Sequence, residues 1–125
     1  MNGNEILADT NAIIYFVNGN SCMKPYENAT VSVSIISEME LLSFPKITDQ
    51  ETDNIKEVIS DCNEINIDDS IKNMTIELRK KYSIKLPDSI IAATAICHGL
   101  PLVTADKGFS KIEELDLRLI EPVFE

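Results

Sequence analysis

The sequence has no apolar run near the ~18–20 residues that a helix needs to cross a bilayer, and no basic-then-apolar signal segment at its N-terminus. We therefore expect a soluble, cytoplasmic protein that enters no membrane. Its three cysteines form neither an even set nor a Cys-x-x-Cys pair, which favours free thiols in a reducing compartment. His98 is the only histidine. A histidine-rich zinc site is excluded, and structural zinc is not expected.

Basic residues are also scarce. The 125 residues carry 11 Lys and Arg against 21 Asp and Glu, a net charge of −10. This balance argues against a generic nucleic-acid coat, which needs a basic face. A nucleic-acid enzyme remains open, because acids can hold metal ions. The length and the 44% hydrophobic content indicate one globular domain spanning residues 1–125 and argue against disorder.

Apolar runs and turn residues predict strands that alternate with helices. Capping and turn signals mark several ends: a Thr-x-x-Glu capping box at Thr48, Asp68 or Asp69 before a helix, Pro87 at a helix start and Gly99 at its end. The predicted strands cover 6–8, 29–34, 64–67, 102–104 and 117–120, and the predicted helices cover 12–17, 35–44, 48–59, 69–82 and 87–98, with a short helical stretch before 115.

This alternation predicts an α/β fold, a three-layer α/β/α sandwich with a short, mostly parallel central sheet. In the helix predicted over 35–44, Ile35, Met39 and Leu42 recur at helical spacing and are expected to form its buried face.

Acids stand where the fold places functional groups. Asp9 directly follows the first strand and Asp106 lies at the end of the fourth. In open parallel sheets, ligands bind at the carboxyl ends of the strands. Asp88 opens the most apolar helix of the chain. Each has a simpler interpretation, because Asp9 and Asp106 can be helix caps and Asp88 can complement a helix dipole.

Glu38 and Glu40 lie two residues apart on one predicted helix, so only one of them is expected to face a shared site. The hydrophobic pattern does not choose between them. Three or four converging carboxylates are the oxygen ligands that suit Mg²⁺ or Mn²⁺, ions that promote phosphodiester hydrolysis.

Four segments resemble, in order, the motifs of the PIN-domain nucleases. They are Ile6–Asn11 (ILADTN), Ser37–Leu42 (SEMELL), Leu86–Ala93 (LPDSIIAA) and Leu102–Phe109 (LVTADKGF). Each motif alone is weak, but four at the expected spacing are strong. The resemblance runs from Ile6 to about Ile120.

The short chain resembles the VapC type, the toxin of a type II toxin–antitoxin pair. That resemblance implies a Mg²⁺-dependent (or Mn²⁺-dependent) endoribonuclease, usually a homodimer, that cleaves RNA of the tRNA or rRNA class and is inhibited by a small antitoxin. It also implies that the acidic residues of the catalytic and metal site are Asp9, Glu40, Asp88 and Asp106, supported by Asn11 and Thr104. Glu40 is preferred to Glu38 only because it precedes Leu41 and Leu42.

Other interpretations remain open. A PIN-like module that binds RNA or a partner without cutting, and a PIN nuclease of RNA processing, share these features. A phosphoacceptor receiver domain is also acidic and five-stranded, but it needs an acid pair after its first strand, where this chain has only Asp9. An RNA surface must be a local basic patch; Arg79–Lys81, Lys85 and Lys107 are the candidates, and a solvated helix end explains them equally well.

Overall fold

The elements follow the predicted alternation of strands and helices. The computed structural model describes residues 4–124, so the outermost residues of the predicted domain, 1–3 and 125, lie outside it. In chain order the elements are β1 (Glu5–Ala8), α1 (Thr10–Val17), the 3₁₀ helix η1 (Ser21–Tyr26), β2 (Thr30–Ser34), α2 (Ile35–Leu42), α3 (Asp49–Ser60), β3 (Asn63–Ile65), α4 (Asp69–Lys81), α5 (Leu86–His98), β4 (Leu102–Thr104), the 3₁₀ helix η2 (Lys107–Lys111) and β5 (Leu117–Leu119).

The five strands form one parallel sheet in the order β3-β2-β1-β4-β5. β1 lies in the centre and pairs with both β2 and β4. In the register between β1 and β4, Ala8 is opposite Val103, so the next residues along the two strands, Asp9 and Thr104, are neighbours at the carboxyl edge. The receiver fold has a different strand order, 2-1-3-4-5.

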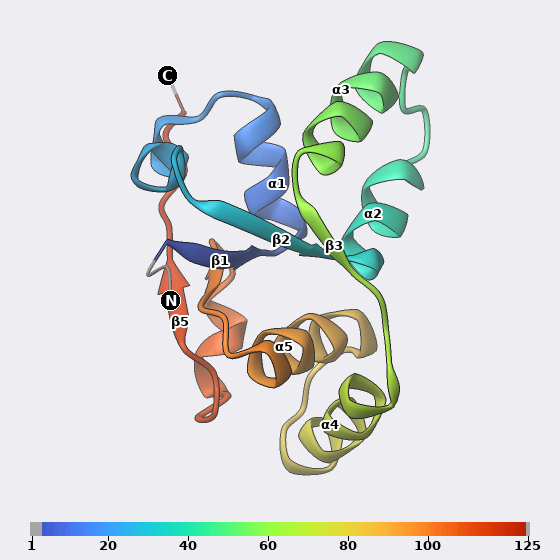
Figure 1. Cartoon of the computed structure of the whole chain (residues 1–125), viewed down its shortest axis with the longest axis vertical. Helices are drawn as coiled ribbons and strands as arrows, with labels where there is room; N and C mark the ends of the chain where they lie inside the picture. Colours follow the sequence, from blue (N-terminus) through green and yellow to red (C-terminus); the bar gives the residue numbers. More distant parts are fainter. Residues whose placement is uncertain (1–3, 125) are drawn as a thin grey trace.

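Helices cover both faces of the sheet, as Figure 1 shows: α1, α2 and α3 lie on one side, and α4 and α5 lie on the other. Alternate side chains of the central strands supply the two cores. Ile6 and Ala8 of β1 pack with α1 and α3, whereas Leu7 packs with α4 and α5. Both faces are therefore buried, which confirms the predicted three-layer α/β/α sandwich.

The predicted helix ends are confirmed where a cap decides them. Thr48 and Glu51 form the reciprocal capping box that opens α3, at 3.0 and 3.1 Å. Asp68, rather than Asp69, caps α4 by accepting from the Ile71 N–H at 2.9 Å. Gly99 ends α5 in the left-handed conformation at φ +62°, which costs a glycine little.

Three predictions need correction. α2 ends at Leu42 rather than Phe44, because Pro45 disfavours the helical conformation at the residue before it. Ser43 is the C-cap, and its hydroxyl donates to the Met39 carbonyl. Its buried face includes Ser37 and Leu41, whereas Met39 is 48% exposed. β3 covers Asn63–Ile65 rather than 64–67, since its pairing with β2 ends opposite Ser34.

Candidate active site

Asp9 connects the first strand to the first helix. Its Oδ1 caps α1 by accepting from the Ala12 N–H at 3.0 Å, and its Oδ2 accepts from the Thr104 hydroxyl at 2.5 Å. The residue is only 4% exposed and Thr104 is fully buried. The capping role predicted as the simpler alternative is therefore confirmed, and Thr104 holds the second carboxylate oxygen at the sheet edge.

The folded structure disfavours the negative charge of Asp9. Burial is the largest influence and raises the pKa of Asp9 from 3.8 to about 6. The hydrogen bonds from Thr104 and Ala12 oppose this rise, while repulsion from Asp106 and Asp88 adds to it. A nearby cation would relieve both the desolvation and the repulsion.

Asp106 is exposed and stands beside Asp9 through Thr104. The Asp106 backbone N–H donates to the Thr104 hydroxyl oxygen at 3.0 Å, and that hydroxyl donates to Asp9. The Asp106 Oδ1 accepts from the Gly108 N–H at 2.7 Å and so caps η2. A Cβ atom on Gly108 would lie 2.9 Å from that same oxygen, so only glycine leaves the carboxylate in place.

Asp88 joins this group from the first turn of α5. It is half-buried, and burial is the largest influence that raises its pKa. Repulsion from Asp106 and from Glu40 raises the pKa further, whereas Lys85 lowers it. The mutual repulsions show that carboxylates from four segments, at 9, 40, 88 and 106, face one region at the carboxyl edge.

The structure separates Glu38 from Glu40. Glu40 Oε1 accepts from the Thr10 hydroxyl at 2.7 Å, and its charge repels that of Asp88. Glu38 instead faces Glu64 of β3. Burial is the largest influence that raises the pKa of Glu64, and the hydrogen bond with Glu38 and the charge of Glu38 raise it further. Glu40 is therefore the acid of α2 that faces the group.

Thr10 and Ser37, which the sequence analysis did not select, place two hydroxyl groups beside Glu40. The Thr10 hydroxyl oxygen lies 3.0 Å from that of Ser37. Because an ionised carboxylate only accepts, the Thr10 proton is directed to Glu40 and its oxygen is free to accept from Ser37. Both belong to the quoted motifs, but a helical hydroxyl alone gives no sign of a site.

Asn11, predicted as a supporting residue, ties α1 to the loop after β4. Its side-chain oxygen accepts from the Ala105 N–H at 3.2 Å. Together with the bond between Thr104 and Asp9, this contact fixes the Asp106 segment against the start of α1.

The chemistry of these four carboxylates suits a hard divalent cation. Its donors are carboxylate oxygens, without a thiolate or imidazole, and oxygen is the ligand that Mg²⁺ and Mn²⁺ prefer. Within residues 4–124, no three acidic, histidine or cysteine side chains are already close enough to enclose an ion. Mg²⁺ fits such an open set, because it keeps several waters and uses one or two carboxylates.

The fold and the four carboxylates together define a parallel α/β/α protein with acids at the carboxyl edge of its sheet. The PIN domain family model matches residues 6–115, so the chain belongs to the PIN domain family, whose members are nucleases. This match decides against the receiver-domain alternative.

Solved structures share this fold. A chain of a toxin–antitoxin complex from Klebsiella pneumoniae is 32% identical, with a TM-score of 0.75, over 88% of this chain and 94% of that chain. A chain of VapBC2 from Rickettsia felis bound to a promoter DNA fragment has a TM-score of 0.81 at 24% identity, over 94% and 99%. A chain of DNA-bound VapBC from Salmonella typhimurium has a TM-score of 0.80 at 22% identity, over 91% and 96%.

These structures confirm the fold that the resemblance to PIN domains implies. The comparison with curated protein sequences finds no match. Among the described residues, none of the helices has the length and apolar character needed to span a membrane.

Proposed function

We propose that this protein is a metal-dependent endoribonuclease, the toxin of a toxin–antitoxin pair, and that it hydrolyses phosphodiester bonds in RNA of the tRNA or rRNA class. The observation that carries the proposal is the group of four carboxylates that includes Asp9. The buried negative charge of Asp9 is unfavourable without a cation. Membership in a nuclease family supports the same conclusion.

The residues divide the work according to their burial and contacts. Asp9, held by Thr104 and the Ala12 N–H, is the fixed ligand. Asp106 and Asp88 complete the metal-binding side from the loop after β4 and from α5. A bound Mg²⁺ or Mn²⁺ supplies charge neutralisation at the scissile phosphate and lowers the pKa of water.

Glu40 serves as a further ligand or orients the attacking water. Thr10 donates to one oxygen of its carboxylate, which fixes that group and leaves the other oxygen for water or metal. No histidine base is required in such a site, and His98 stands exposed at the far end of α5.

An inhibitory antitoxin is the proposed partner, and a homodimer is the proposed assembly in the cytoplasm. The similar structures from Klebsiella, Rickettsia and Salmonella are all toxin–antitoxin complexes. An antitoxin arm that places a basic side chain among these carboxylates would relieve their repulsion, so the charge pattern favours this mode of inhibition.

The test is cleavage of a mixed tRNA and rRNA pool by purified protein, with Mg²⁺, with Mn²⁺ and with EDTA, beside the Asp9→Asn variant. We expect cuts at a few sites that require metal and are lost in the variant. Absence of cleavage by folded, antitoxin-free protein that still binds Mg²⁺ would instead favour a non-catalytic binding module. Cleavage without any inhibitory partner would favour an RNA-processing enzyme.

A further inference from the structure

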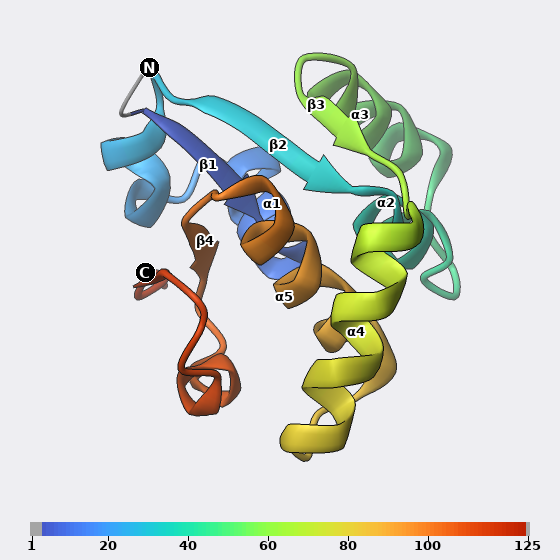
Figure 2. The ribbon, with the colours of Figure 1, turned by 60° about the horizontal axis from the view of Figure 1, so that its bottom comes forward.

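Basic side chains gather on two segments that adjoin Asp88 and Asp106 in the sequence. Six of the 11 Lys and Arg residues lie in residues 79–85 and 107–111. The first segment spans the end of α4 and the turn into α5, and it leads to Asp88. The second is η2, which follows Asp106. In Figure 2 the α4–α5 turn and η2 both lie at the lower end of the molecule.

Only two of these six cations are neutralised within the described residues. Lys80 pairs with Glu77 at 3.6 Å and Lys81 with Glu114 at 3.2 Å. The other four form no ion pair there, and two of them contact only backbone carbonyls, which leave the charge intact. These four are Arg79, Lys85, Lys107 and Lys111, and we call them the basic rim.

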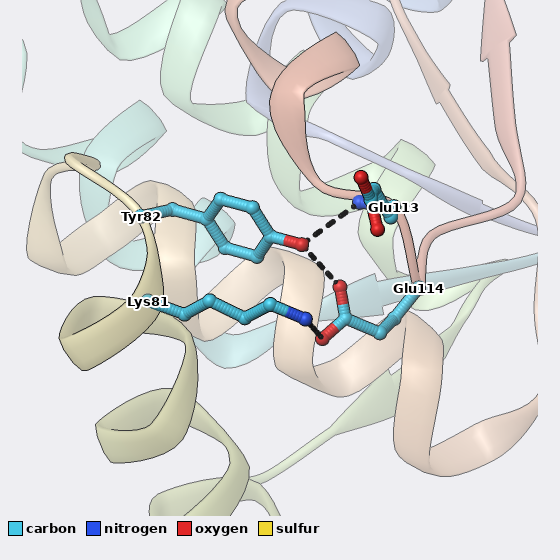
Figure 3. A network of polar contacts seen from close by, with 4 residues as sticks. All are labelled: Lys81, Tyr82, Glu113 and Glu114. Carbon is cyan, nitrogen blue, oxygen red and sulfur yellow. Dashed lines mark hydrogen bonds and ion pairs between the residues drawn. The ribbon is translucent and has the colours of Figure 1, made fainter.

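A cluster of polar contacts joins the two segments (Figure 3). The Tyr82 hydroxyl donates to Glu114 Oε1 at 2.6 Å and accepts from the Glu113 N–H at 3.2 Å. The Lys81 ammonium bonds the other Glu114 oxygen and lies 5.4 Å from the Tyr82 ring centre. We call these four residues the Tyr82 clamp.

A further bond reinforces the clamp, since the Lys111 ammonium donates to the Ser83 carbonyl at 2.7 Å. The α4–α5 turn and the η2–β5 loop are therefore held against each other by hydrogen bonds and an ion pair between the two segments. This arrangement holds the segment that leads to Asp88 against the segment that follows Asp106.

We propose that the basic rim is the track along which the sugar-phosphate backbone of RNA reaches the carboxylates of Asp9, Glu40, Asp88 and Asp106, and that the Tyr82 clamp holds the track together. The inference rests on the proposed ribonuclease function. With a net charge of −10, the chain needs a local cationic surface to hold a polyanion, and the rim lies on the two segments that lead to Asp88 and follow Asp106.

Two double variants test the rim. Lys85→Gln with Lys107→Gln removes two rim charges, and Lys24→Gln with Lys56→Gln removes the same charge from η1 and α3. α3 lies at the opposite end of the molecule in Figure 1. All are made in an Asp9→Asn background with Mg²⁺, so that a labelled oligouridylate stays intact while its binding is followed by fluorescence anisotropy at several salt concentrations.

Each phosphate contact on a single strand contributes about 0.7 to the salt slope, which is about fivefold in affinity at ~0.1 M salt. We expect the rim double variant to lose about 1.4 of slope and about 25-fold in affinity, and the control to stay within about twofold. Equal losses in the two variants would overturn the track, as would no detectable binding by the parent.

Tyr82→Phe tests the clamp, because it removes the hydroxyl bonds without changing any charge. We expect weaker RNA binding and a smaller salt slope with unchanged Mg²⁺ affinity, whereas Tyr15→Phe, whose hydroxyl has no described hydrogen bond, changes neither. Unchanged RNA binding in Tyr82→Phe would overturn the clamp.

Failure of the rim is distinguishable from failure of the proposed function. If the parent protein with Asp9 intact cleaves RNA and the rim double variant cleaves with the same KM, the enzyme stands and the track is wrong. If the parent binds RNA through the rim but never cleaves, the track stands and the ribonuclease proposal is wrong.

Discussion

Thr104 donates its hydroxyl proton to Oδ2 of Asp9, although the two residues are 95 positions apart in the sequence. The bond is possible because β4 and β1 are parallel neighbours and both strands end at this edge. The same hydroxyl oxygen accepts from the Asp106 N–H. One buried side chain therefore sets the positions of two of the proposed metal ligands.

Thr104→Val should raise the pKa of Asp9 above its present value of about 6, because the variant removes a hydrogen bond that favours the carboxylate. A hydrogen bond to a charged group contributes about 1.5 kcal/mol, so the midpoint of the pH–rate profile should rise by about one unit. Thr104→Ser keeps the hydroxyl and should keep the midpoint. Identical midpoints for the Val and Ser variants would rule out this role.

Asp9→Asn should stabilise the metal-free protein at pH 7. The folded pKa of about 6 lies above the ordinary 3.8, so the folded state binds the proton more tightly than the unfolded state does. The free energy of unfolding of the parent therefore falls as pH rises from about 3.8 to 6, by at most about 3 kcal/mol. The variant lacks this loss.

Denaturant titrations in EDTA at several pH values check the sign. The advantage of Asp9→Asn should be largest near pH 7 and shrink toward pH 4, where the parent is protonated. Asp53→Asn, an exposed substitution on α3, should show no such trend. A stability advantage that does not depend on pH would show that Asp9 carries no unfavourable buried charge.

Mg²⁺ binding should weaken in acid. The ion and a proton compete for Asp9, so the affinity should fall by up to about tenfold per pH unit below about pH 6 and level off above it. Isothermal calorimetry across this range measures the effect. A flat profile would mean that the ion binds away from Asp9.

Gly108→Ala should weaken Mg²⁺ binding while leaving the fold intact. The new methyl group would lie 2.9 Å from Asp106 Oδ1, and the flexible carboxylate moves more easily than the backbone. Loss of such a supporting position typically costs about tenfold in metal affinity. Ser110→Ala in the same short helix is the matched control. Equal Mg²⁺ affinities in the two variants would contradict the account of Asp106.

Most of the fold was predictable because the apolar runs and the turn and capping residues in the sequence agree with the packing of the folded chain. The run Ile6–Ala8 is apolar on both faces of a central strand, and Pro87 and Gly99 mark the two ends of α5. The placement of Asp9, Asp88 and Asp106 was predictable for the same reason. Asp9 directly follows β1, Asp106 follows β4 after one residue, and Asp88 lies at the start of an apolar helix.

The orientation of α2 was not predictable in this way. Its sequence, IISEMELL, has apolar residues on every side, so the spacing of Ile35, Met39 and Leu42 does not define one face. The helix buries Ser37 because Thr10 lies 3.0 Å from it across the site. Glu40 is distinguished from Glu38 only by tertiary contacts, that of Glu40 with Thr10 and that of Glu38 with Glu64.

We propose that Asp9, Glu40, Asp88 and Asp106 act together in catalysis and that Glu38 does not. The most direct measurement compares metal-dependent RNA cleavage by the four single amide variants with that of Glu38→Gln. Circular dichroism and thermal unfolding of each protein show whether its fold is intact.

We expect each of Asp9→Asn, Glu40→Gln, Asp88→Asn and Asp106→Asn to lower kcat/KM by at least about 100-fold, the scale of a lost catalytic acid or base. Glu38→Gln should stay within about twofold of the parent. Full cleavage by a folded Asp9→Asn protein, or a loss in Glu38→Gln equal to that in Glu40→Gln, would contradict the account.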